Sequence, residues 1–119
     1  MRKYKHLDEV TKALDSFDYQ KVISFLTDDC YFQAGNLVPI KGKQEIYEMF
    51  NSFKDSLLEV THNIDNIIEG NDSVVYYGNV QYKRKDGFEL QVPVCDVFKV
   101  ENNKIKEYYI FIDWSELLK

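Results

Sequence analysis

The feature that most constrains this chain is a change of hydrophobic period close to Leu58. Before Leu58, apolar side chains recur every three or four positions, which is the spacing that places one stripe of a helix against a core. From Leu58 onward, apolar and polar side chains alternate, as they do in strands with one buried face. The 119 residues, 45% of them hydrophobic, suffice to bury a core. The sequence therefore predicts one α+β domain over residues 1–119, with helices before a curved, mostly antiparallel sheet.

Three amphipathic segments precede the change of period, at residues 4–17, 19–26 and 46–57. Asp18 stands where a side chain can cap the second helix, and Thr27-Asp28-Asp29 ends its apolar pattern. Short strand signals at residues 30–33 and 38–40 lie between the second and third segments. We therefore expect three helices before the main sheet.

Turn sequences divide the second part of the chain into four strands. They are Gly70-Asn71-Asp72, Asp86-Gly87 and Asn102-Asn103. Asp-Gly between two alternating runs favours a tight hairpin, because this pair tolerates positive φ angles, so residues 74–100 are predicted to form an antiparallel hairpin. Asp113 followed three residues later by Glu116 is a capping-box pattern and predicts a short C-terminal helix.

Charge and composition exclude several function classes. The net charge is −5 and the basic residues are scattered, whereas phosphate binding needs clustered Lys and Arg. No apolar run approaches the roughly 18 residues of a membrane-spanning helix, and the basic N-terminus lacks the apolar stretch of a secretory signal. Cys30 and Cys95 show no metal or redox spacing and are interpreted as reduced packing residues. We expect a cytoplasmic protein without metal or cofactor that binds neither nucleic acid nor membrane.

One carboxylate interrupts the apolar face of the predicted strand from Phe88 to Val100. Every even-numbered side chain in this run is apolar except Asp96. Because residues i and i+2 lie on the same side of a strand, the Asp96 carboxylate is predicted to point into the interior. A buried, unpaired carboxylate is costly, so the group must find hydrogen-bond donors or keep its proton.

Polar groups also interrupt the strand that begins near Val60, where His62 and Asn66 are predicted to face inward. Neighbouring strands contribute aromatic and apolar side chains to the same side, namely Tyr76, Tyr82, Phe98, Tyr108 and Ile110. Apolar walls with a few fixed polar groups are typical of small-molecule sites. We therefore predict a ligand pocket lined by these residues, with Asp96 and His62 as the catalytic candidates.

A structural interpretation stands beside the catalytic one. Asp96 could be an acid held by tyrosine hydroxyls or a backbone amide, because structural networks also perturb pKa values. A lone inward histidine such as His62 is often a satisfied core residue. The pattern alone leaves both alternatives open.

The sequence resembles the SnoaL-like branch of the nuclear transport factor 2 superfamily over nearly its whole length. The specific parts are Asp28-Asp29 before a strand, the run Ile40-x-Gly42-x-x-x-Ile46, and the hairpin "VCDVFKVENNKIKEYYIFIDW". The resemblance implies a cone-shaped α+β barrel of about 5–6 strands with a pocket at its wide end. It also implies a homodimer formed through the sheet.

The same resemblance bears on mechanism. Asp96 resembles the protonated acid that donates to the oxyanion in ketosteroid isomerases. The isomerase base would fall near Ala34 and its tyrosine near Val10, and the acid of the related epoxide hydrolases at Ile110, so these standard reactions lack their residues here. His62 could instead act as the base, as inward histidines do in related dehydratases and cyclases.

Two hypotheses follow. In the first, the chain is an isomerase, cyclase or dehydratase that uses Asp96, assisted by His62, Tyr76 or Tyr82, on a small apolar molecule without a cofactor. In the second, it is a non-catalytic dimeric domain that binds a ligand or a partner.

Overall fold

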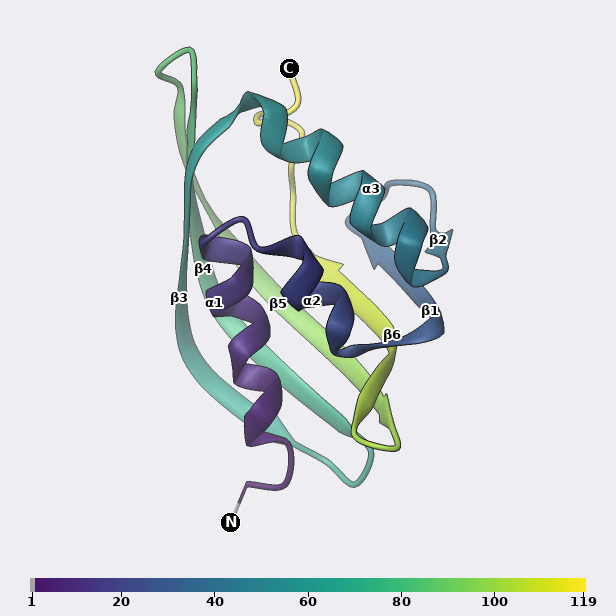
Figure 1. The fold of residues 1–119 in the computed structure, drawn as a ribbon. Helices are drawn as coiled ribbons and strands as arrows, with labels where there is room; N and C mark the ends of the chain where they lie inside the picture. Colours follow the sequence, from purple (N-terminus) through teal and green to yellow (C-terminus); the bar gives the residue numbers. More distant parts are fainter. Residues whose placement is uncertain (1) are drawn as a thin grey trace.

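The computed structural model describes residues 2–119, which form one layer of helices packed on one curved sheet. The helices are η1 (Lys5–Asp8), α1 (Glu9–Asp15), α2 (Tyr19–Ser24), α3 (Lys43–Phe53) and η2 (Lys54–Ser56). The strands are β1 (Leu26–Ala34), β2 (Ile40–Lys41), β3 (Leu57–Glu69), β4 (Ser73–Arg84), β5 (Glu89–Glu101) and β6 (Lys104–Phe111). Figure 1 shows α1, α2 and α3 on the same face of the sheet. The predicted α+β class and the three helices before the main sheet are confirmed.

The sheet has the strand order β2-β1-β6-β5-β4-β3. All neighbouring pairs are antiparallel except β1 and β6, which run parallel. The predicted hairpin between residues 74 and 100 is formed by β4 and β5. Asn102 and Asn103 have φ angles of 52° and 64°, the left-handed values that a tight turn between β5 and β6 requires.

The backbone and a capping side chain set the end of α1 and the start of α2. Phe17 has a φ of 59°, which is incompatible with a continuing helix, and the Asp18 side chain accepts a hydrogen bond from the Lys21 amide at 3.2 Å. The predicted second helix was two residues too long, because Leu26 instead pairs with Ile105 of β6 and begins β1. Leu57 was likewise assigned to a helix but begins β3 opposite Arg84.

A register shift in β3 reverses the faces of that strand. The shift lies between Ile64 and Asn66, and Gly78 on β4 lies opposite, where any side chain would collide with the Asn63 carbonyl oxygen. Beyond the shift, Ile68 is 53% exposed, and the Asn66 amide donates to the hydroxyl of Tyr77 on the outer face at 3.2 Å. The predicted inward placement of Asn66 is therefore wrong, because one extra residue exchanges the two faces of a strand.

The C-terminal segment forms a turn in place of the predicted helix. The Asp113 carboxylate accepts from the Ser115 amide at 2.9 Å, only two residues on, which is the geometry of an Asx turn. One further hydrogen bond, from the Leu118 amide to the Trp114 carbonyl at 2.9 Å, closes the turn. This turn brings Trp114 and Leu117 into the core, where they are 6% and 3% exposed.

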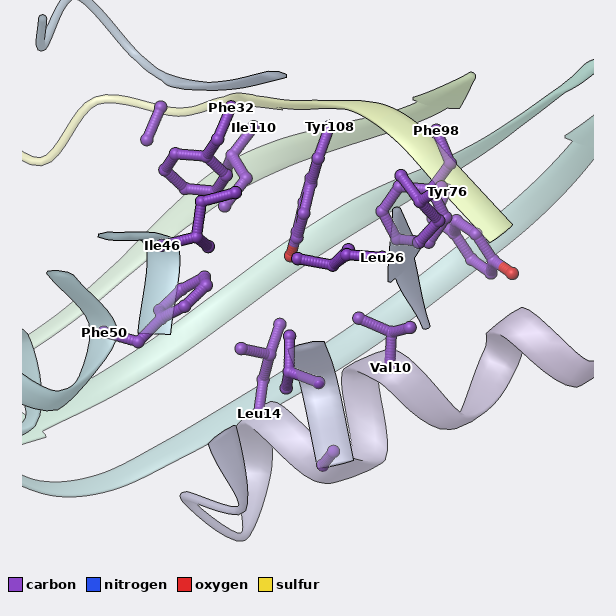
Figure 2. Packing of buried hydrophobic residues seen from close by; sticks show 14 of the residues in the cluster. Val10, Leu14, Leu26, Phe32, Ile46, Phe50, Tyr76, Phe98, Tyr108 and Ile110 are labelled. Carbon is purple, nitrogen blue, oxygen red and sulfur yellow. The ribbon is translucent and has the colours of Figure 1, made fainter. Parts of the chain in front are cut away.

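The core fills the space between the helices and the inner face of the sheet. Figure 2 shows Val10 and Leu14 of α1 facing aromatic side chains of the strands. Ring contacts are frequent, and the Phe98 and Tyr108 rings meet edge to face at 4.9 Å. Cys30 is buried in this core and Cys95 is half-buried, and both are free thiols. Among residues 2–119, Asp96 is the one Asp, Glu, Lys, Arg or His residue that is buried, 1% exposed among apolar neighbours.

Candidate functional site

Asp96 lies on the inner face of β5, opposite Tyr76 of β4 and Ile110 of β6. Neither of its carboxylate oxygens has a hydrogen-bond partner among residues 2–119. Burial removes the hydration that stabilises the charged form, and this raises the pKa of Asp96 to about 7; a proton on His62 would partly oppose this effect. Asp96 can therefore carry a proton close to neutral pH.

His62 is held from the helical layer. The carboxylate of Asp15, the last residue of α1, lies 2.5 Å from His62 Nδ1. The same carboxylate accepts the His62 backbone N–H at 3.0 and 3.1 Å. The His62 side chain is only 8% exposed, and it lines an apolar cavity between the helices and the sheet. With Nδ1 bound by Asp15, the nitrogen that remains for chemistry is Nε2.

The sequence prediction missed Asp15, which lies 47 residues before its partner. A weak signal was present, because an acidic residue in the last turn of a helix opposes the helix dipole and needs a compensating contact. The pattern did not say which contact that would be.

An apolar cavity of about 30 Å³ lies between α3, the N-terminal helices and the sheet. Three of the predicted site residues line it, namely His62, Tyr82 and Ile110. Aromatic side chains that the prediction did not include complete the wall, namely Tyr19, Phe50, Phe53 and Trp114. The first three of these were predicted as helical core residues, and their place at a cavity depends on how α2 and α3 cross the sheet.

Asp96 is adjacent to the cavity wall but does not line the cavity. Val94 and Ile110, its neighbours along β5 and across to β6, are the wall residues at this point. No hydrogen bond joins Asp96 to His62 within residues 2–119, although the two groups are close enough for their charges to interact. The structure thus brings the two candidates to the same region without direct contact.

Tyr82 and Trp114 form a fixed pair in the cavity wall. Trp114 Nε1 donates a hydrogen bond to the Tyr82 hydroxyl at 2.9 Å, and the Trp114 ring packs against Phe53 with 4.7 Å between centroids. Burial raises the pKa of Tyr82 well above its ordinary value, so Tyr82 remains a hydroxyl. Trp114 follows the last strand, outside the alternating pattern from which the pocket was predicted.

The Tyr108 hydroxyl is a second buried polar group without a partner among the described residues. Figure 2 shows the Tyr108 ring reaching from the sheet toward the helices, with its oxygen among apolar side chains. Burial and the nearby Asp96 raise the pKa of Tyr108 well above its ordinary value. Tyr108 and Asp96 are therefore two buried groups that can donate a hydrogen bond to a ligand.

Two other predicted site residues belong to the packed core. The Tyr76 hydroxyl donates to the Asp8 carboxylate at 2.7 Å, and Arg2 binds the same carboxylate, so this hydroxyl is already engaged. Phe98 is fully buried between the rings of Tyr76 and Tyr108. Neither Tyr76 nor Phe98 lines the cavity.

The residues expected by analogy with known reactions are apolar core residues. Val10 and Ala34 are 0% and 2% exposed, and Ala34 is paired with Ile110 across β1 and β6. Within residues 2–119, no cluster of three or more His, Cys, Asp or Glu side chains has the arrangement of a metal site. Among the same residues, no helix has the length and apolar character needed to cross a membrane.

Comparison with solved structures shows the same fold in several proteins. A protein from Shewanella putrefaciens CN-32, named after SnoaL-like polyketide cyclases, is 21% identical with a TM-score of 0.86, over 99% of this chain and 95% of that chain. An NTF2-like protein of unknown function from Burkholderia pseudomallei is 17% identical with a TM-score of 0.89, over 99% and 96% of the two chains. An LEH-like epoxide hydrolase from M. tuberculosis is 18% identical with a TM-score of 0.79, over 95% and 84%. These TM-scores show the cone-shaped fold, and identities this low indicate no particular reaction.

Sequence comparison gives the family. No curated protein matches the chain. The model of the SnoaL-like domain matches residues 7–108, which is most of the chain and includes His62, Asp96 and Tyr108. The chain therefore belongs to the SnoaL-like domain family.

Proposed function

We propose that this protein binds a small, largely apolar carbonyl compound at the cavity and moves a proton on it, as an isomerase, cyclase or dehydratase does. His62 is the general base and Asp96 the neutral acid. The observation that carries the proposal is the buried Asp96 carboxyl, which has no hydrogen-bond partner among residues 2–119 and lies beside a cavity lined by His62.

The two groups suit opposite halves of such a reaction. His62 Nε2 takes a proton from the carbon next to the carbonyl, while the protonated Asp96 donates a hydrogen bond to the oxygen on which negative charge develops. A protonated carboxyl can do this near neutral pH only where burial raises its pKa, which is the situation of Asp96.

The size of the cavity limits the ligand. A volume of about 30 Å³ holds one or two water molecules. A substrate must therefore widen the cavity when it binds.

A non-catalytic dimeric domain is the second candidate, and the outer face of the sheet favours it. Phe111 and Tyr77 are 57% and 40% exposed there, on either side of Cys95 in the strand register. A homodimer in the cytoplasm, paired through this face, would cover these side chains. Sedimentation that finds only monomer at micromolar concentration would count against this pairing.

Carbon deprotonation of 5-nitrobenzisoxazole tests the catalytic proposal without a known substrate. A base that removes the ring C–H breaks the N–O bond and releases a coloured nitrophenolate. We expect the wild-type protein to accelerate this reaction, and Asp96→Asn and His62→Gln each to lower the rate roughly 10²- to 10⁴-fold.

Two variants serve as matched controls for this assay. They are Asp28→Asn, whose side chain is 98% exposed, and His6→Gln, which removes the other histidine. Both controls should keep the wild-type rate. A wild-type rate no higher than the rate in buffer without protein would reject the assignment of His62 as the base, and so would full activity in His62→Gln. The binding domain would then be the better candidate.

A further inference from the structure

Asp15 contacts His62 at two points, the backbone N–H and the ring nitrogen Nδ1. β3 is an edge strand, so its outward N–H groups lack a neighbouring strand. The Asp15 carboxylate satisfies one of these groups, the backbone N–H of His62, at 3.0 Å. The contact with the ring nitrogen Nδ1 at 2.5 Å is additional and fixes the side chain.

We propose that Asp15 is a positioning residue that holds His62 in the tautomer with the proton on Nδ1, so that Nε2 is the free base toward the cavity. The role of Nε2 as a catalytic base rests on the proposed function. The tautomer of His62 does not depend on it.

The chemistry of the two groups dictates the tautomer. An ionised carboxylate accepts hydrogen bonds and cannot donate them. Asp15 is 30% exposed, so water supports its charge, and the hydrogen bond to Nδ1 therefore requires the proton to be on the ring. In a neutral imidazole the other nitrogen is then an unprotonated acceptor.

The same contact stabilises the ring after it has acted. When Nε2 takes a proton from a substrate carbon, the imidazole becomes a cation, and the electron pair of the broken C–H bond remains on the substrate. The Asp15 carboxylate faces this cation through Nδ1–H. The proton can return to another substrate atom, which restores the neutral ring, so the cycle needs no further reactant.

The position of Asp15 agrees with a dedicated role. An acid in the last turn of α1 is placed against the partial negative charge of the helix end. The two hydrogen bonds to His62 offset this cost. The shielded ring, with a side chain 8% exposed, is also kept from rotating into water.

Nitrogen-15 NMR of histidine tests the tautomer directly, with His6→Gln used to assign the two histidines. In the wild-type protein we expect neutral His62 to carry its proton on Nδ1. Asp15→Asn keeps the size of the side chain and an acceptor for the backbone N–H, but its NH₂ group can face Nδ1 and donate to it. We expect this variant to shift the ratio of the tautomers toward Nε2–H roughly tenfold or more, the effect of about one hydrogen bond.

Asp15→Ala removes both contacts and should shift the ratio in the same direction, and Asp28→Asn should leave it unchanged. An amide spectrum like that of the wild type shows that each variant is folded. If His62 keeps the proton on Nδ1 in folded Asp15→Asn and Asp15→Ala, the proposal is overturned.

The 5-nitrobenzisoxazole assay separates the two proposals. Both Asp15 variants should lose rate together with the change of tautomer, roughly 10²-fold or more for Asp15→Ala. If the tautomer shifts in the Asp15 variants but the wild-type protein has no activity, the proposed function is rejected and the positioning role of Asp15 stands. A normal rate with a shifted tautomer would contradict the link between them.

Discussion

At the scale of single residues, Asp96 sets the energetics of the site. A carboxyl that is 1% exposed and has no partner among the described residues destabilises the folded state whenever it is ionised. His62 and Tyr108 are close enough to influence the carboxyl electrostatically, yet neither makes a hydrogen bond that removes the cost. Active sites commonly keep such strained groups at the expense of stability.

Replacing Asp96 by Asn should therefore stabilise the protein in a pH-dependent way. The pKa of Asp96 is raised from 3.8 to about 7 by burial. Between these values the unfolded chain has already released the proton that the folded chain keeps, so wild-type stability falls as the pH rises. The difference between these two pKa values corresponds to roughly 4 kcal/mol.

Urea unfolding of both proteins from about pH 4 to pH 8 measures this effect. The advantage of Asp96→Asn in free energy of unfolding should grow up to about pH 7 and then level off. An advantage that does not change with pH would mean that Asp96 ionises normally in the folded protein.

The sequence located Asp96 and His62 because both lie where the strand alternation is uninterrupted, and alternation then decides which side a residue faces. Alternation could not reveal Asp15, since its contact with His62 joins a helix to a strand far along the chain. It also could not show that the Tyr76 hydroxyl is engaged by Asp8.

At the scale of secondary structure, the register shift in β3 decides what the site contains. Before the shift, His62 faces the helices, and after it Asn66 faces outward and Ile67 lies opposite Tyr76. A period-2 pattern carries no sign of an inserted residue, which explains the error for Asn66. The one sequence clue was Gly78, a residue that usually weakens a strand unless a bulge or a close backbone approach needs it.

Gly78→Ala should therefore be strongly destabilising, because its Cβ would collide with the Asn63 carbonyl oxygen. We expect a loss of roughly 1–3 kcal/mol or more in urea unfolding. Gly70→Ala is the matched control, since the nearest atom to its Cβ is the Ser73 hydroxyl, a side-chain group that can move. Equal stability of the two variants would contradict the account of the shift.

At the scale of the whole molecule, the cone is nearly filled by its own side chains. The helices close one face of the sheet (Figure 1), and only about 30 Å³ remains beside His62. The fold class, the hairpins and the inner face followed from periodicity and turn sequences. The cavity did not, because its volume depends on the packing of side chains such as Phe53 and Trp114, which no local pattern specifies.

The central claim is that Asp96, beside the cavity, keeps its proton up to nearly neutral pH. Carboxyl ¹³C NMR on protein labelled at aspartate, with Asp96→Asn used for assignment, measures its titration directly. The structure predicts a midpoint of about 7 for Asp96, far above the ordinary 3.8. A midpoint at or below 3.8 would show that the fold does not favour the protonated carboxyl and would contradict the proposed acid role.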